Sequence, residues 1–151
     1  MNLGKVNKVI LCDIDGTIAN NDHRQHYLKG AKDWDNFFGN LNNDIPYKKI
    51  IELVEEQHEK GLEIVFLTGR PERFRQETSE WLKKNLSFSN FLLVMRGNKD
   101  YRNKIEVKRE LFKENCDAKN ISFCLENDPD LIKLWQEIGL ITKDANLINS
   151  S

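Results

Sequence analysis

The chain has 151 residues, of which 39% are hydrophobic and 31% are charged, and its formal net charge is -1. A chain of this length is expected to form a single domain, residues 1–151, around one core. The near-zero net charge excludes proteins that bind nucleic acid or membranes through a strongly basic overall charge, so any such affinity must come from a local patch.

Cysteine usage and hydropathy predict a cytoplasmic protein. The spacing of Cys12, Cys116 and Cys124 matches neither a disulfide framework nor a zinc site, and we interpret them as reduced thiols. No apolar run approaches the ~18–20 residues of a membrane span, and residues 1–5 contain no apolar signal core. We therefore expect no membrane partner.

Short apolar runs of strand length recur along the chain. They occupy residues 9–12, 64–67, 91–95 and 121–125, with a shorter fifth run at residues 140–141. Runs that are apolar throughout, rather than at alternate positions, are typical of strands that are buried on both faces of a sheet.

Apolar residues at helical spacing separate these runs. Predicted helices begin after Pro46, at Pro71, around Ile105 and at Pro129, and the first and last of them end at Gly61 and Gly139. Strands and helices together predict an α/β fold, a three-layer Rossmann-like parallel sheet with helices on both faces. The polar tail, residues 146–151, is expected to be frayed.

Residues 19–45 do not follow this alternation. The segment is polar, is longer than a typical connection, and contains Trp34, Phe37 and Phe38. We predict a small cap that is inserted after the first strand, covers the strand ends and has one short helix around Trp34. Its aromatic side chains could stack a nucleobase or form the small core of the cap.

Polar side chains follow the predicted strands, at the end of the sheet where ligands bind. Asp13 and Asp15 follow the first strand, and carboxylates two residues apart face the same way on an extended chain. They repel each other unless a cation such as Mg²⁺ is present. One can attack phosphorus, while the other exchanges protons with the leaving oxygen and with water. The alternative is that Asp-Gly here only forms a turn.

Further positions could complete such a site. Thr68 offers a hydroxyl at a predicted helix N-terminus that suits a phosphate, or it merely caps that helix. Lys108 interrupts an apolar helix face and would offset negative charge, or it lies at the helix edge in water. The polar group after the fourth strand could bind Mg²⁺ or form a turn and helix cap; it consists of Glu126, Asn127 and Asp128.

The order of these residues resembles that of the haloacid-dehalogenase-like phosphatases. The run Asp13-Ile14-Asp15-Gly16-Thr17 resembles their first motif, Asp-x-Asp-Gly-Thr, and Thr68, Lys108 and residues 126–128 resemble the second, third and fourth motifs. The resemblance extends from about Lys8 to Gly139. It implies a magnesium-dependent phosphatase with Asp13 as nucleophile, Asp15 as general acid and base, and Thr68 and Lys108 as further catalytic residues. The implied Mg²⁺ ligands are Asp13, Asp15, Glu126, Asn127 and Asp128.

The sequence is also similar to the 3′-phosphatase domain of phage polynucleotide kinase/phosphatase. The similarity implies that Arg24 and Arg70 assist the phosphate, and the expected substrate-binding residues also include Thr17, Gly69 and Arg102.

The chain departs from the phage domain in two places. Asn127 replaces an acidic residue of the phage domain, so either Asp128 compensates for the lost charge or the affinity for Mg²⁺ falls. Lys104 replaces a second acidic residue, near the lysine motif, and this replacement bears on the identity of the substrate. The sequence has no Gly-rich Lys-Ser/Thr loop, so we expect no kinase domain in it. A separate kinase or ligase is a candidate partner.

The substrate stays open. Residues 96–113 include seven basic and three acidic residues, which could hold a nucleic-acid backbone or form a solvated helix face. A polynucleotide 3′-phosphate is the leading substrate, and a mononucleotide or other small phosphomonoester is the alternative. Two other classes are a signalling receiver domain, against which Asp15 and the cap argue, and a non-catalytic module that binds phosphate or nucleic acid.

Overall fold

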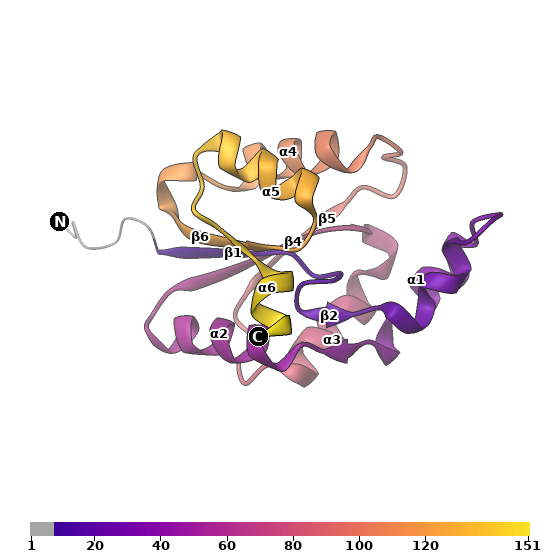
Figure 1. The fold of residues 1–151 in the computed structure, drawn as a ribbon, viewed down its shortest axis with the longest axis horizontal. Helices are drawn as coiled ribbons and strands as arrows, with labels where there is room; N and C mark the ends of the chain where they lie inside the picture. Colours follow the sequence, from indigo (N-terminus) through magenta and orange to yellow (C-terminus); the bar gives the residue numbers. More distant parts are fainter. Residues whose placement is uncertain (1–7) are drawn as a thin grey trace.

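The computed structural model describes residues 8–151, and one sheet lies between two layers of helices (Figure 1). Residues 1–5, in which we expect no signal core, lie outside the described residues. Within residues 8–151, no helix is both long enough and apolar enough to cross a membrane.

The sheet consists of five strands in the order β5-β4-β1-β6-β7, and every neighbouring pair is parallel. The strands are Val9–Cys12 (β1), Glu63–Pro71 (β4), Leu92–Arg96 (β5), Ile121–Glu126 (β6) and Thr142–Asp144 (β7). In the central strand, Leu11 lies opposite Val65 of β4 and Cys124 of β6. The predicted parallel α/β sheet is therefore confirmed.

The fifth strand was predicted two residues too early. Residues 140–141 connect helix α5 (Pro129–Ile138) to β7, which is the polar segment Thr142–Asp144. Leu140 is apolar because it is buried in the core, whereas Ile141 is 68% exposed. Since β7 lies at the edge of the sheet and pairs only with β6, it does not need an apolar sequence.

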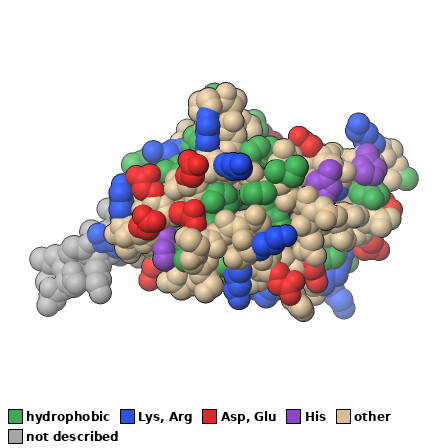
Figure 2. Space-filling view, turned by 90° about the horizontal axis from the view of Figure 1, so that it is seen from below, with side chains coloured by type: hydrophobic (Ala, Val, Ile, Leu, Met, Phe, Trp, Pro, Cys, Tyr) green, Lys and Arg blue, Asp and Glu red, His purple; other side chains and the backbone are tan. Residues whose placement is uncertain are grey.

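Helices cover both faces of the sheet. On one face lie α2 (Lys48–Glu59), α3 (Arg75–Asn85) and the short α6 (Ala145–Ser150), and on the other lie α4 (Lys104–Asn115) and α5 (Figure 1). The view of the molecule from below, on the side of α2 and α3, shows acidic and basic side chains interspersed (Figure 2). This face therefore offers no surface of a single charge.

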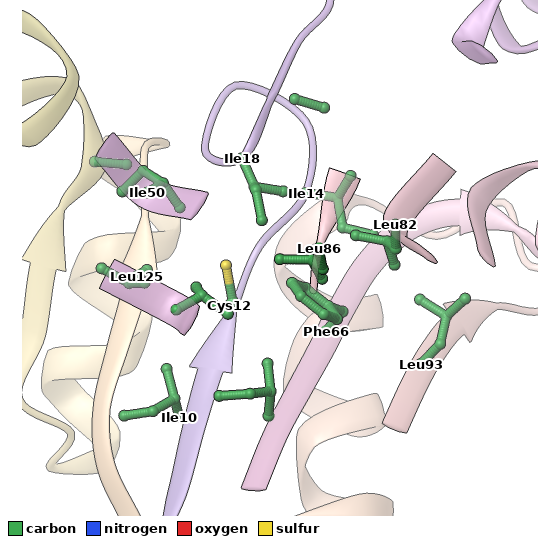
Figure 3. Close-up of a cluster of buried hydrophobic side chains, with 14 of the residues drawn as sticks. Ile10, Cys12, Ile14, Ile18, Ile50, Phe66, Leu82, Leu86, Leu93 and Leu125 are labelled. Carbon is green, nitrogen blue, oxygen red and sulfur yellow. The ribbon is translucent and has the colours of Figure 1, made fainter. Parts of the chain in front are cut away.

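Side chains of β1 enter both helical layers alternately, as the two-residue period of a strand requires. Ile10 and Cys12 belong to the cluster that also contains Ile50 of α2 (Figure 3), whereas Leu11 packs on the other side with Trp135 of α5. These two cores hold the carboxyl ends of the strands in fixed positions.

Two local expectations were wrong. Pro71 does not open a helix, because β4 continues to Pro71 and α3 begins only at Arg75, after a 3₁₀ turn. The tail is not frayed but forms α6, in which Ala145 is fully buried. Asp144 caps this helix by accepting a hydrogen bond from the Asn146 backbone amide.

The cap is present where it was expected. It begins with β2 (Ala19–Asn20), which pairs antiparallel with β3 (Ile45–Pro46), and includes α1 (Trp34–Gly39) and 3₁₀ helices at Asp22–Leu28 and Leu41–Asn43. Helix α1 lies beyond the carboxyl ends of the strands (Figure 1). Phe37 and Phe38 are buried in a small cap core, whereas Trp34 remains 46% exposed.

A glycine substitution tests the end of helix α5. Gly139 follows the helix with φ of 102°, a left-handed conformation that costs other residues about 1–2 kcal/mol. We expect Gly139→Ala to lower the free energy of unfolding by this amount in urea denaturation. Gly39, the last residue of α1, has no positive φ and open space around it, so Gly39→Ala should not destabilise the protein; equal losses in both variants would contradict this account.

Candidate active site at the carboxyl ends of the strands

A tight loop follows β1 and carries the first group of site residues. The backbone amides of Thr17, Ile18 and Ala19 all donate to the carbonyl oxygen of Ile14. Gly16 has φ of 82°, and a Cβ there would collide with the Asn127 side chain, whose Cγ would lie 2.8 Å away. The loop therefore requires glycine both for its conformation and for the close approach of Asn127.

Asp13 is buried against a lysine. Its Oδ1 lies 2.6 Å from Nζ of Lys108, which also approaches Oε1 of Glu126 at 3.5 Å. Burial, and then the Glu126 carboxylate, raise the pKa of Asp13 above its usual range, while Lys108 opposes this rise. Burial alone would lower the pKa of Lys108, but the charges of Asp13 and Glu126 outweigh it and raise that pKa. One ammonium group thus serves two buried carboxylates.

Asn127 brings a fourth oxygen-bearing group to this loop. One outer atom of its amide lies 2.8 Å from Asp13 Oδ2, 3.0 Å from the backbone oxygen of Asp15 and 3.1 Å from Thr17 Oγ1. With the amide nitrogen inward, Asn127 donates hydrogen bonds to these atoms. With the amide oxygen inward, this oxygen lies at those three distances from the other oxygen atoms, close to the about 3 Å edge of an octahedral Mg²⁺ site. The residues present therefore fit a magnesium ion.

The two acidic neighbours of Asn127 are engaged elsewhere. Glu126 accepts hydrogen bonds from Trp135 Nε1 and from the backbone amides of Asn127 and Asp128. Asp128 caps α5 and forms an ion pair of 2.7 Å with Lys104. No group of three or more His, Cys, Asp or Glu side chains in residues 8–151 could hold a metal ion. An ion at this site would therefore meet the carboxylate of Asp13, the carbonyl of Asp15 and the amide of Asn127.

Asp15 lies in a different electrostatic environment from Asp13. Its Oδ1 accepts hydrogen bonds from Nη2 of Arg24 at 2.7 Å and from Nη2 of Arg70 at 2.9 Å, and its Oδ2 accepts one from Arg70 Nε. Burial favours a higher pKa, but Arg70 and Arg24 outweigh it and lower the pKa of Asp15 to about 2. Its side chain keeps 26% exposure, whereas those of both arginines are fully buried. Asp15 is thus an ionised carboxylate within reach of solvent.

Asp44 is the site residue that the sequence analysis missed. Its fully buried carboxylate accepts hydrogen bonds from Arg24 and Arg70 at 2.7 and 3.1 Å, and from His23 at 2.7 Å. Trp81 Nε1 also donates to its backbone oxygen. Asp44 therefore holds both arginines in the position from which they contact Asp15. In the sequence it is a single acidic residue at the end of a polar segment, with no pattern that shows burial.

The remaining predicted residues are divided between the site and its surroundings. Thr68 is buried and its hydroxyl accepts a hydrogen bond from the Arg70 backbone amide, but it lies within β4, so the predicted helix N-terminus is not there. Gly69 accepts a hydrogen bond from Arg96 through its carbonyl. Arg102 pairs with Asp100 and Glu110, both at 2.7 Å, and has no contact with Asp13 or Asp15 among its recorded polar interactions.

Comparison with known proteins gives one family match. A family model described as the polynucleotide kinase PNKP phosphatase domain matches residues 7–146. A putative bifunctional polynucleotide kinase/RNA ligase of Autographa californica nuclear polyhedrosis virus is 26% identical over 139 residues, which cover 91% of this chain and 19% of the viral protein. The chain therefore spans about a fifth of that relative.

Solved structures share the fold. A chain in the structure of a Pnkp1/Rnl/Hen1 complex superposes with a TM-score of 0.77 at 24% identity, over 93% of this chain and 46% of that chain. CbbY from Rhodobacter sphaeroides, in complex with phosphate, superposes with a TM-score of 0.62 at 14% identity, over 89% of this chain and 84% of its own.

The buried arginine pair depends on Asp44, and substitution tests this. Asp44→Asn leaves two buried guanidinium groups with one carboxylate, so we expect the free energy of unfolding to fall by about 3–5 kcal/mol in urea denaturation. Asp35→Asn is the matched control, because Asp35 also pairs with an arginine, Arg73, but is 93% exposed at 3.6 Å and should change stability by less than about 1 kcal/mol. A loss at Asp44 as small as that of the control would show that Asp44 does not support the arginines.

Proposed function

Because this chain belongs to the family of polynucleotide kinase phosphatase domains and is a phosphatase of the haloacid-dehalogenase-like superfamily, we propose that it removes 3′-phosphates from polynucleotide ends. The reaction proceeds through an aspartyl-phosphate on Asp13 and depends on Mg²⁺.

One observation carries the mechanism: two aspartates two residues apart have opposite surroundings. Asp13 is buried beside Lys108 and three neutral oxygen-bearing groups, whereas Asp15 is ionised between two guanidinium groups. The raised pKa of Asp13 and the low pKa of Asp15 do not by themselves assign the two tasks, because a nucleophile must be ionised and a general acid must hold a proton. A bound Mg²⁺ would lower the pKa of Asp13 and keep it ionised, so the assignment rests on the contacts of the two side chains. We assign the attack on phosphorus to Asp13 and the proton transfers to Asp15.

Asp13 carries out the first step. Thr17 donates to its Oδ2 at 3.0 Å and Lys108 holds its Oδ1, so the carboxylate is oriented for in-line attack. A carboxylate oxygen bonds to phosphorus while the bond from phosphorus to the leaving oxygen breaks. Lys108 and the Thr68 hydroxyl stabilise the charge on the transferring phosphoryl oxygens.

Asp15 carries out the proton transfers. Asp15 is a carboxylate in the free protein, and to accept a proton from the water that hydrolyses the aspartyl-phosphate it needs a higher pKa than it has there. To protonate the leaving oxygen in the first step, its pKa must rise. The negative charge of a bound phosphate beside Asp15 would offset the charge of Arg24 and Arg70 and so raise the pKa of Asp15, while both arginines stay held by Asp44.

Mg²⁺ would be held by the Asp13 carboxylate, the Asp15 carbonyl and the Asn127 amide oxygen. When bound, it supplies positive charge beside the phosphoryl oxygens that Lys108 alone does not provide. The donor set contains a single carboxylate, as is usual for Mg²⁺, which keeps several water molecules and binds substrate phosphate.

The proposed substrate rests on the family and on the relatives rather than on the basic stretch of residues 96–113. Arg102, Lys104 and Lys108 in this stretch pair with acidic residues, and Arg96 donates to backbone carbonyls. The viral relative is named as a kinase/RNA ligase and the solved neighbour is in a complex with Rnl and Hen1. On this basis we propose that the present protein also works with a kinase or ligase, as a separate partner.

We propose a cytoplasmic location, because Cys12, Cys116 and Cys124 are all free thiols.

Phosphate release from a panel of substrates tests the proposed function. The panel contains a 3′-phosphorylated oligonucleotide, the 5′-phosphorylated form, 3′- and 5′-mononucleotides and p-nitrophenyl phosphate, each with Mg²⁺ and with EDTA. We expect Mg²⁺-dependent release with the highest kcat/KM for the 3′-phosphorylated oligonucleotide. A higher kcat/KM for a mononucleotide would show that the substrate is a mononucleotide and not a polynucleotide end. No phosphate release from any substrate would favour a non-catalytic binding module.

The nucleophile is tested by Asp13→Asn. The amide has nearly the same shape but cannot attack phosphorus, so we expect kcat to fall at least about a thousandfold. Circular dichroism and the unfolding midpoint show whether the variant folds. A folded Asp13→Asn protein with kcat within tenfold of the native value would reject Asp13 as nucleophile.

The metal ligand at the end of β6 is tested by two variants. Asn127→Asp adds a second carboxylate to the oxygen cluster, so Mg²⁺ affinity by isothermal titration calorimetry should rise at least about tenfold. In EDTA the same variant should melt at a lower temperature, because the new charge lies beside Asp13. Asp128→Asn should leave Mg²⁺ affinity unchanged, since Asp128 is engaged with Lys104 and the α5 backbone. If Asn127→Asp left Mg²⁺ affinity unchanged and Asp128→Asn lowered it, Asp128 would be the Mg²⁺ ligand.

A further inference from the structure

The loop between β5 and α4, residues 97–103, is attached to the candidate active site by one arginine. Arg96 donates from Nε to the Gly69 carbonyl at 3.0 Å, and from Nη1 to the carbonyls of Asp100 at 3.0 Å and Arg102 at 2.8 Å. Gly69 lies between Thr68 and Arg70 in β4. The loop is thereby fixed against the strand end that contributes to the site, and both residues that flank Tyr101 are held.

Further contacts fix the same loop. The backbone amide of Arg73 donates to the Asn98 side chain at 2.7 Å, which adds a second connection to the segment that follows β4. The Arg102 side chain forms two hydrogen bonds with Asp100 and one with Glu110 of α4, and the Arg102 backbone amide donates a third to Asp100. A surface loop with this number of contacts is ordered before any ligand binds.

This ordered loop displays an aromatic side chain to solvent. Tyr101 is 87% exposed, more than any other large hydrophobic side chain in residues 8–151. Among the recorded interactions of the described residues, its ring forms no aromatic or cation–π pair and its hydroxyl forms no hydrogen bond. Tyr101 therefore does not stabilise the fold, although its backbone position is fixed.

Trp34, the other exposed aromatic residue at this end of the molecule, differs in this respect. Its ring stacks on Phe38 at 5.9 Å and meets the edge of Phe37 at 5.8 Å. Lys32 lies over the ring, 5.7 Å from its centre. The Trp34 ring thus already packs on residues of the cap core, whereas both faces of the Tyr101 ring are open.

We propose that Tyr101 is the stacking platform for the nucleobase of the nucleotide that carries the 3′-phosphate. This inference rests on the proposed function. Stacking on Tyr101 would favour a polynucleotide end over a small ester that has no base. A flat ring can stack on any base, so it adds affinity without base preference. Because the loop is already ordered, little conformational entropy is lost when the base binds.

The test compares Tyr101→Ala with Tyr101→Phe on three substrates. These are a 3′-phosphorylated oligonucleotide, the same oligonucleotide with an abasic 3′-terminal nucleotide, and p-nitrophenyl phosphate. We expect Tyr101→Ala to lower kcat/KM for the first substrate between about fivefold and a hundredfold, and to leave the other two unchanged. Tyr101→Phe, which keeps the ring, should match the native protein on all three. Ile141→Ala is the control, because Ile141 is 68% exposed and precedes β7, whose first residue lies opposite Cys124 in the middle of β6 and not at the strand end that carries the site.

The outcomes separate this inference from the proposed function. If the native protein prefers the oligonucleotide but Tyr101→Ala affects the normal and abasic ends equally, or affects neither, the stacking platform is wrong and the polynucleotide substrate stands. If the native protein shows no preference for the oligonucleotide over p-nitrophenyl phosphate, both are wrong. Loss of p-nitrophenyl phosphate turnover in Tyr101→Ala would also overturn the platform, since it would mean that the substitution disturbs the catalytic residues themselves.

Discussion

Asp13 and Asp15 are two residues apart and both carry carboxylates, whose negative charges repel each other. The arrangement of the site follows from the need to give each carboxylate its own partners. Asp13 faces Lys108 and the oxygen atoms of Thr17 and Asn127, whereas Asp15 faces two guanidinium groups. In shared surroundings, mutual repulsion would raise the pKa of one of them still further. The separate partners give the pair one buried nucleophile and one ionised, partly exposed proton acceptor.

The same constraint connects the cap to the sheet. Asp15 needs two cations, of which Arg70 comes from β4 and Arg24 from the cap. Asp44, at the end of the insertion, orients both. The ring of Phe37 lies 4.4 Å below the Arg24 guanidinium and its carbonyl accepts from Arg24. The aromatic core of the cap therefore supports the position of a charge beside Asp15, so the cap is a part of the site.

The sequence allowed the layered fold to be predicted, because apolar runs mark buried strands. It left Lys108 open between a partner for the charge of Asp13 and a lysine in water, and the structure places its ammonium group 2.6 Å from Asp13. The sequence did not reveal Asp44, whose partners lie 20 and 26 residues away in the sequence with no periodic signal. It misplaced β7, since a polar edge strand lacks the apolar pattern on which the prediction depended. It missed α6 because a helix of six residues forms through its cap and its packing rather than through propensity.

Trapping the phosphoryl group on Asp13 tests the central claim most directly. In an Asp15→Asn variant, p-nitrophenyl phosphate can still transfer its phosphoryl group, because nitrophenolate leaves without a proton, but water is no longer activated. The account predicts a burst of one nitrophenolate per protein molecule, and acid-quenched mass spectrometry should find one phosphoryl group on Asp13 in the tryptic peptide of residues 9–24. Steady phosphate release without a phosphorylated peptide, or a phosphoryl group on another residue, would contradict it.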